Sequence, residues 1–146
     1  MRIFKEIFGD TGFEVICLKF LKNCLLFLVG GGAYVGLELL WRGRSHISMF
    51  AAGGICFLLI GKLNSVQPKL PLPLRMLTGA GIITMVELAA GLIANRDYGV
   101  WDYRGLPGNF LGQICPAFTA LWVPVALLAL GLHSWLDNRL DHLLAR

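Results

Sequence analysis

Two glutamates lie within apolar stretches, and they are the residues best able to carry chemistry. Glu38 lies one helical turn before Arg42, the spacing that favours an ion pair, and Glu87 is the single charge between Met76 and Ala94. A carboxylate at mid-membrane costs about 2.5–3.5 kcal/mol on insertion scales, so it pairs, faces the protein interior or stays protonated. Glu87 is therefore expected either to form a structural hydrogen bond that locks the helices together or to act as a ligand for an ion, proton or solute. Glu38 predicts either an interfacial pair with Arg42 or part of the same site.

A wet, aromatic stretch at 95–109 (NRDYGVWDYRGLPGN) lies between two long apolar runs. Its Trp and Tyr residues are typical of an interfacial belt. Its charges and glycines favour a structured cap instead, because irregular backbone at membrane depth is tolerated only against protein or a water-filled cavity. We expect Asp102 to be neutralised by Arg104, or by Arg42 or Arg44 in the preceding turn.

These two features together predict one polar pocket that opens outward. We expect Gln113 to open the fourth span and to complete this pocket, and Tyr34 to extend the polar face of Glu38. The predicted substrate-binding residues are Glu38, Arg42, Glu87, Trp101, Asp102, Tyr103, Asn109 and Gln113.

No catalytic residue, cofactor or metal site is predicted. No Walker loop, Rossmann glycine pattern, HExxH or GxSxG motif occurs in the sequence. The histidines are far apart along the chain, and the cysteines, which lack metal-ligand spacing, are interpreted as buried thiols: Cys17, Cys24, Cys56 and Cys115. An enzyme of any kind is therefore the less favoured interpretation.

The elements that must position these residues are membrane helices. The chain is 56% apolar and 15% charged, with a mean hydropathy of +0.67, whereas soluble domains average roughly 45–50% apolar and about 25% charged. A span needs about 20 residues, and four blocks meet this requirement: 23–41, 47–63, 76–94 and 111–135. The predicted fold class is all-α integral membrane, with four transmembrane helices in two antiparallel hairpins.

Flanking segments complete the predicted domain organisation. Residues 1–22 predict an interfacial amphipathic helix that Gly9 and Gly12 break, residues 23–136 the four-helix membrane domain, and residues 137–146 a cytoplasmic tail. Alternating prolines between 64 and 75 favour an extended, stiff connector. Pro124 should kink the fourth span.

The net charge of +4 is interpreted as membrane topology, and no nucleic-acid partner is predicted. Of the 13 Lys and Arg residues, nine fall near the two termini and the proline-rich connector, and four fall in the turn at 42–46 and the wet stretch. Because basic residues concentrate on the inner side, both termini are predicted to lie in the cytoplasm of a bacterium. The protein is then multi-pass in the bacterial cytoplasmic membrane.

Several segments resemble a family of small bacterial polytopic proteins, the ABC-transporter permease family labelled CmpB. They are LWRGRSH (40–46), GGICF (53–57), VEL (86–88), WDY (101–103), LPGN (106–109) and LGQIC (111–115), within a resemblance that covers roughly residues 30 to 130. Members often carry serine after the WDY segment, and Arg104 stands there in this chain. The resemblance implies a multi-pass membrane protein; the permease name by itself establishes no activity.

The favoured function is a small transporter or transport subunit, with the pocket holding a small polar or cationic solute. One alternative is a non-transporting membrane scaffold or interaction protein, in which the glutamates only hold the fold. A third is a lipid-active membrane enzyme that uses outer-face carboxylates. The expected partners are the lipid bilayer and either further copies of the chain or a partner membrane subunit.

Overall fold

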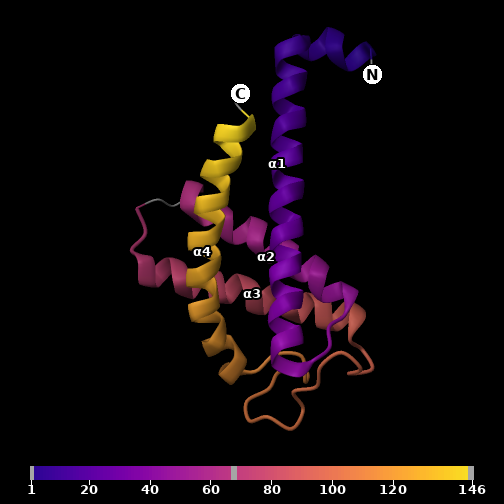
Figure 1. The fold of residues 1–146 in the computed structure, drawn as a ribbon. Coiled ribbons are helices and arrows are strands. Elements are labelled where there is room, and N and C mark those ends of the chain that lie inside the picture. The colour runs from indigo at the N-terminus through magenta and orange to yellow at the C-terminus, as the bar shows by residue number, and fades with distance from the viewer. Residues whose placement is uncertain (1, 67–68, 145–146) are drawn as a thin grey trace.

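The structure, a computed structural model, describes residues 2–66 and 69–144, without the side chains of residues 2–11, 64 and 144. Four helices form in these residues, and all are drawn in Figure 1: α1 (Arg2–Arg42), α2 (Ile47–Val66), α3 (Leu72–Ala94) and α4 (Pro116–Leu144). Three of them contain stretches long and apolar enough to cross a membrane, and the apolar stretch of α2, Ile47–Leu63, is shorter. The all-helical prediction is confirmed.

The helices form two packed pairs. α1 packs mainly against α2, and α3 mainly against α4, while α2 also contacts α3 and α4. In Figure 1 the long helices α1 and α4 run alongside one another, and α2 and α3 cross them at a steep angle. The N and C ends of the drawn chain lie at one end, and the loop between α3 and α4 lies at the other. How the pairs cross a bilayer remains a prediction.

Two predicted helix boundaries need correction at the N-terminal ends of α3 and α4. α3 begins at Leu72 rather than 76, since proline is accepted in a first turn and Pro73 occupies one. α4 begins at Pro116 rather than 111. The delay at α4 has a conformational cause, because Leu111 and Gly112 have φ of +53° and +64°, outside the helical region. The connector before α3 is extended at Pro71, with φ −59° and ψ 147°.

α1 differs from the expected pair of separate pieces. Its helical backbone continues from Arg2 to Arg42 through Gly9 and Gly12. Glycine within a helix costs only about 1 kcal/mol relative to alanine, which the helix tolerates. The first turns nevertheless bend away from the rest of the helix (Figure 1). The predicted amphipathic face at 1–11 lies outside the described side chains.

Glycines bring α1 and α2 into direct backbone contact. A Cβ atom added at Gly30 would overlap the Cβ of Phe57 and lie 2.9 Å from the carbonyl oxygen of Gly53. A Cβ atom at Gly31 would lie 2.6 Å from the carbonyl oxygen of Phe50. Small residues at helix interfaces allow this approach. Gly32, by contrast, has open space beside it.

This contact predicts different effects on stability for two alanine substitutions on the same helix. Gly30→Ala should lower the free energy of unfolding by about 1–3 kcal/mol, because the methyl group overpacks the interface. Gly32→Ala, the matched control, should be neutral or slightly stabilising, because it gains helix propensity without a clash. Thermal unfolding in detergent measures both variants. Equal melting temperatures would contradict the close contact between α1 and α2.

The buried core links the other helices and the loop. One cluster joins α2, α3 and α4 through Cys56, Ile60, Ile83, Ala126 and Leu130. A second cluster joins α2 to the loop through Met49, Ala52 and Trp101. At the opposite end from the loop, Lys22 of α1 forms ion pairs with Asp137 and Asp141 of α4, at 2.8 and 2.6 Å.

Candidate solute-binding site

A buried asparagine anchors the loop to the end of α3. Asn95 is 0% exposed, and its amide nitrogen donates to the carbonyl oxygen of Trp101 at 2.7 Å and to the side-chain oxygen of Gln113 at 3.0 Å. Its amide oxygen accepts from the backbone N–H of Val100 at 2.8 Å. One side chain thus closes the turn after α3 and joins it to the segment before α4.

Gln113 and Trp101 complete this anchor. The Gln113 side-chain nitrogen donates to the backbone oxygen of Asn95 at 3.0 Å, and the Trp101 indole donates to the backbone oxygen of Gln113 at 2.9 Å. Gly91 makes room for this arrangement, because a Cβ atom there would collide with the Gln113 side chain. Gln113 therefore lies in the loop, which corrects the expectation that it opens the fourth span.

Glu87 belongs to α3 and lies buried against α4 and the loop. It is 4% exposed. One carboxylate oxygen accepts from the Tyr103 hydroxyl at 2.9 Å, and the other accepts from the Trp122 indole at 3.0 Å. Both donors are neutral, and Glu87 takes part in none of the ion pairs among the described residues. The carboxylate is hydrogen-bonded but has no counter-charge in contact with it.

Glu38 is held differently, at the end of α1. It forms the predicted ion pair with Arg42 and accepts a hydrogen bond from the Ser45 hydroxyl. Arg42 also donates to the backbone oxygen of Val100 at 2.6 Å, which ties the loop to α1. Arg42 is therefore shared between a carboxylate on its own helix and the loop backbone.

The exposed face of the loop carries its own ion pair. Arg104 donates twice to the carboxylate of Asp102, at 2.9 and 2.7 Å, and its guanidinium lies 4.1 Å from the centre of the Tyr98 ring. Hydrogen bonds from the Arg104 side chain and backbone lower the pKa of Asp102 to about 2. Of the partners considered for Asp102, Arg104 is the one the structure shows.

Tyr103 turns the other way, toward the interior. Its ring stacks on Phe118 of α4, with centroids 4.6 Å apart. Burial, followed by the nearby Glu87 carboxylate, raises the pKa of the Tyr103 hydroxyl. The hydroxyl therefore keeps its proton at neutral pH and remains a donor to Glu87.

A cavity of about 600 Å³ opens at this end of the molecule, and all four helices and the loop contribute to it. Six of the eight predicted site residues line it, namely Glu38, Arg42, Glu87, Trp101, Asp102 and Tyr103. Aromatic rings make up much of the remaining wall, from Tyr34, Trp41, Phe118 and Trp122. The cavity therefore combines a deep carboxylate with several ring faces.

The other two predicted residues lie outside the cavity lining. Gln113 is buried in the loop anchor, and Asn109 caps a turn by donating to the backbone oxygens of Arg104 and Leu106 at 3.2 and 2.8 Å. Both residues support the loop that forms one wall of the cavity. Contributors to the site or its support that sequence reasoning missed include Ser45, Asn95, Phe118 and Trp122. The two aromatics carried a usable signal, because they fall in the half of α4 nearest the wet stretch.

The cavity presents carboxylates, an arginine and aromatic rings as its recognition groups. Among the described residues, no group of three His, Cys, Asp or Glu side chains is close enough to hold a metal ion. A buried carboxylate beside aromatic faces suits a cation, which is attracted both by the charge and by the ring quadrupoles.

A helical fold with three membrane-length apolar stretches is that of a small polytopic membrane protein. Residues 14–145 match the model of the family described as "Putative ABC-transporter type IV", so the chain belongs to that family. The predicted resemblance is thereby confirmed, over a longer part of the chain than the motifs covered. Neither the curated proteins nor the solved structures include a match.

Proposed function

We propose that the chain is a membrane transport subunit whose cavity at the loop end holds a small cationic solute. Glu87 is the deep anion of this site, Glu38 lies nearer the mouth, and the loop at 101–104 forms one wall. The family and its apolar helices already indicate a transport-related membrane protein. The kind of solute and its place in the cavity are the proposal.

The environment of Glu87 carries this proposal. A carboxylate within a membrane span is costly and is retained mainly for function or for pairing. Here both oxygens receive only neutral hydrogen bonds, from Tyr103 and Trp122, whereas the carboxylate of Glu38 has Arg42 beside it. A cation in the cavity would supply the missing counter-charge.

The aromatic walls favour a weakly hydrated cation, such as an alkylammonium, over a strongly hydrated metal ion. The centres of the Tyr34 and Trp122 rings lie 5.9 Å apart, and Tyr103 donates a hydrogen bond from its hydroxyl to Glu87. Cation–π attraction contributes about 0.5–2 kcal/mol per ring, most when water is excluded. Arg44, which is exposed, lies at the rim and remains hydrated.

The proposal includes an arrangement of the chain in the membrane. All four helices span the bilayer as two hairpins, with the loop on the outer face and both termini in the cytoplasm, as the distribution of Lys and Arg favours. The sequence contains no nucleotide-binding motif. ATP-driven transport therefore requires a separate ATPase, and the expected partners are further copies of the chain or another membrane subunit.

Glu87→Gln tests the proposed anion. Tetramethylammonium is the probe, and quenching of tryptophan fluorescence is the readout, since Trp101 and Trp122 lie at the site. The substitution preserves an acceptor for one hydrogen bond while it removes the charge, so affinity should fall by about tenfold or more, equivalent to about 1.4 kcal/mol or more.

Glu14→Gln removes an exposed carboxylate from α1 and serves as the matched control, with unchanged affinity expected. Sodium chloride at equal ionic strength controls for screening. Binding by Glu87→Gln that equals the unmodified protein would exclude Glu87 as the solute anion.

One observation favours a second candidate, the membrane scaffold. The bonds from Tyr103 and Trp122 join α3 to the loop and to α4, as a structural lock would. Under this function, Glu87→Gln lowers the melting temperature in detergent, and tetramethylammonium has no effect on fluorescence or on stability. A ligand-dependent rise in melting temperature would decide against the scaffold, because only a bound ligand stabilises the folded state.

A further inference from the structure

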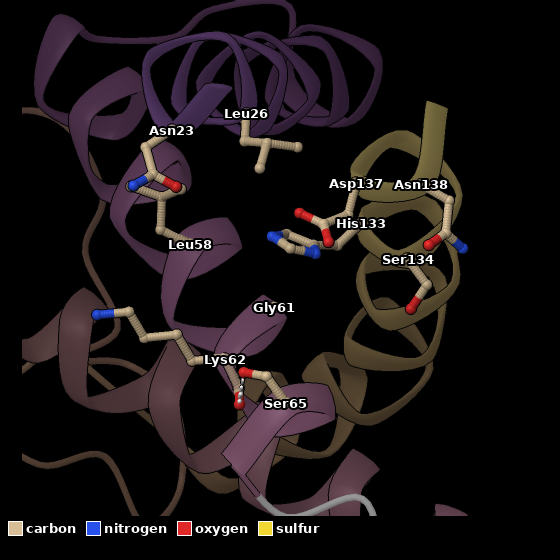
Figure 2. Close-up of a pocket in the computed structure, with 10 residues that line it drawn as sticks. All are labelled: Asn23, Leu26, Leu58, Gly61, Lys62, Ser65, His133, Ser134, Asp137 and Asn138. Atoms are coloured by element: carbon tan, nitrogen blue, oxygen red, sulfur yellow. Dashed lines mark hydrogen bonds between the residues drawn. The ribbon is translucent and has the colours of Figure 1, made fainter. Parts of the chain in front are cut away.

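A second cavity, of about 480 Å³, lies at the opposite end of the molecule from the loop. Figure 2 shows it between α1, α2 and α4, with Asn23 on one side and His133 and Asp137 on the other. The His133 ring and the Asp137 carboxylate point toward its centre (Figure 2). Its polar lining differs from the aromatic lining of the cavity beside Glu87.

The two cavities share their helices. On α4 the cavity beside Glu87 reaches as far as Val125, and the second cavity begins at His133. On α1 the corresponding limits are Tyr34 and Leu26. At about 1.5 Å per residue, either interval corresponds to a separation of about 12 Å along the helix. The cavities are therefore stacked along the same groove of helices, with a short closed section between them.

Buried apolar side chains lie in this closed section. Phe57 is 4% exposed, Ala126 is 0% exposed and Leu130 is 4% exposed. Phe57 packs directly against Gly30, and its ring lies 5.2 Å from the ring of His133. Phe57 therefore lies between the two cavities, in contact with α1 at Gly30 and with the His133 ring of the second cavity, and the absence of a side chain at Gly30 gives it room.

We propose that the second cavity is the other mouth of the path that begins at Glu87, and that Phe57 closes the path between the two. This inference rests on the proposed function, since the same cation is taken to use both mouths. Asp137 supplies the anion at the second mouth. Lys22 holds Asp137 and Asp141 together, so an arriving cation can replace Lys22 at Asp137 while Lys22 keeps Asp141.

Cysteine labelling in proteoliposomes tests whether the cavities open to opposite sides. The four native cysteines are replaced by alanine, and Val125→Cys and Ser134→Cys place one thiol in each cavity. A membrane-impermeant, quaternary-ammonium thiosulfonate is then applied to one face at a time. Val125→Cys should react only from the face of the loop, and Ser134→Cys only from the face of the termini. Reaction of both thiols from the same face would overturn the proposal.

Phe57→Ala tests the closing residue. It should make Val125→Cys react from both faces, at a rate raised about tenfold or more from the face of the termini, equivalent to about 1.4 kcal/mol. Phe50→Ala is the control, because it removes a ring from the same contact between α1 and α2. Phe57→Val provides a smaller truncation if the alanine variant does not fold. No gain of access in a folded variant would show that Phe57 is not the closing residue.

The labelling readout separates this inference from the proposed function. Access to the two thiols does not depend on whether tetramethylammonium binds at Glu87. Labelling from opposite faces without tetramethylammonium binding would contradict the proposed solute and leave the two mouths in place. Binding with labelling from one face only would retain the solute site and exclude the second mouth.

Discussion

Asn95→Ala is expected to release the loop and to lower the free energy of unfolding by about 2–4 kcal/mol. The wild-type side chain bonds to the backbone of Val100, the backbone of Trp101 and the side chain of Gln113, all within a fully buried site. A buried donor or acceptor that loses its partner costs about 1–3 kcal/mol, and alanine orphans several of them at once. Water that enters the space left by the side chain can bond to some of these groups, so part of the lost free energy is recovered.

Hydrogen exchange across residues 96–113 measures the release of the loop, and thermal unfolding in detergent measures the stability. Asn138→Ala is the control, because Asn138 is exposed at the far end of α4. Unchanged exchange in the loop of Asn95→Ala would show that the other contacts, such as the bond from Arg42 to Val100, hold it without the anchor.

Arg42→Met should have the second large effect and lower the free energy of unfolding by about 3–5 kcal/mol. Arg42 and Glu38 are 22% and 12% exposed at their side chains, so this ion pair is largely removed from water. Taking away one partner leaves a mostly buried charge without compensation, which is the expensive way to break such a pair. The backbone oxygen of Val100 loses its donor in the same variant.

A double-mutant cycle isolates the ion pair. Arg42→Met combined with Glu38→Gln should recover part of the stability, because the remaining side chain no longer carries a charge. Glu38→Gln alone is the third corner of the cycle. Additive losses in the double variant would mean that Arg42 acts mainly through the loop backbone.

The sequence identified most of the polar side chains that line the cavity but not the partner of Glu87 on α4. Local spacing was enough for the pair of Glu38 and Arg42, because residues four apart share a helix face whatever the tertiary fold. The partner of Glu87 on α4 was not accessible in this way. Trp122 reaches Glu87 only because of how α4 is rotated against α3, and that rotation is set by packing.

The loop shows the same limit on a smaller scale. Its composition predicted a structured cap, but its anchor depends on backbone conformations that composition does not specify. Tyr98 and Leu111 both have positive φ, at 58° and 53°, which non-glycine residues adopt rarely. These turns direct Gln113 back to Asn95 and delay the start of α4 to Pro116. A helix extended from position 111 would have placed Gln113 on a different face.

In a bilayer, the apolar stretch of α2 would be shorter than the hydrocarbon core is thick. Its apolar stretch, Ile47–Leu63, reaches about 25 Å at 1.5 Å per residue, whereas the hydrocarbon core is about 30 Å thick. A steep crossing relative to α1 and α4 (Figure 1) shortens its reach along those helices further. If α2 spans the bilayer as proposed, local thinning of the lipid beside it would match the short stretch, at a cost of a fraction of a kcal/mol per Å of mismatch. Short-chain lipids should therefore collect along α2, and the acyl-chain length of the host membrane becomes a variable in reconstitution.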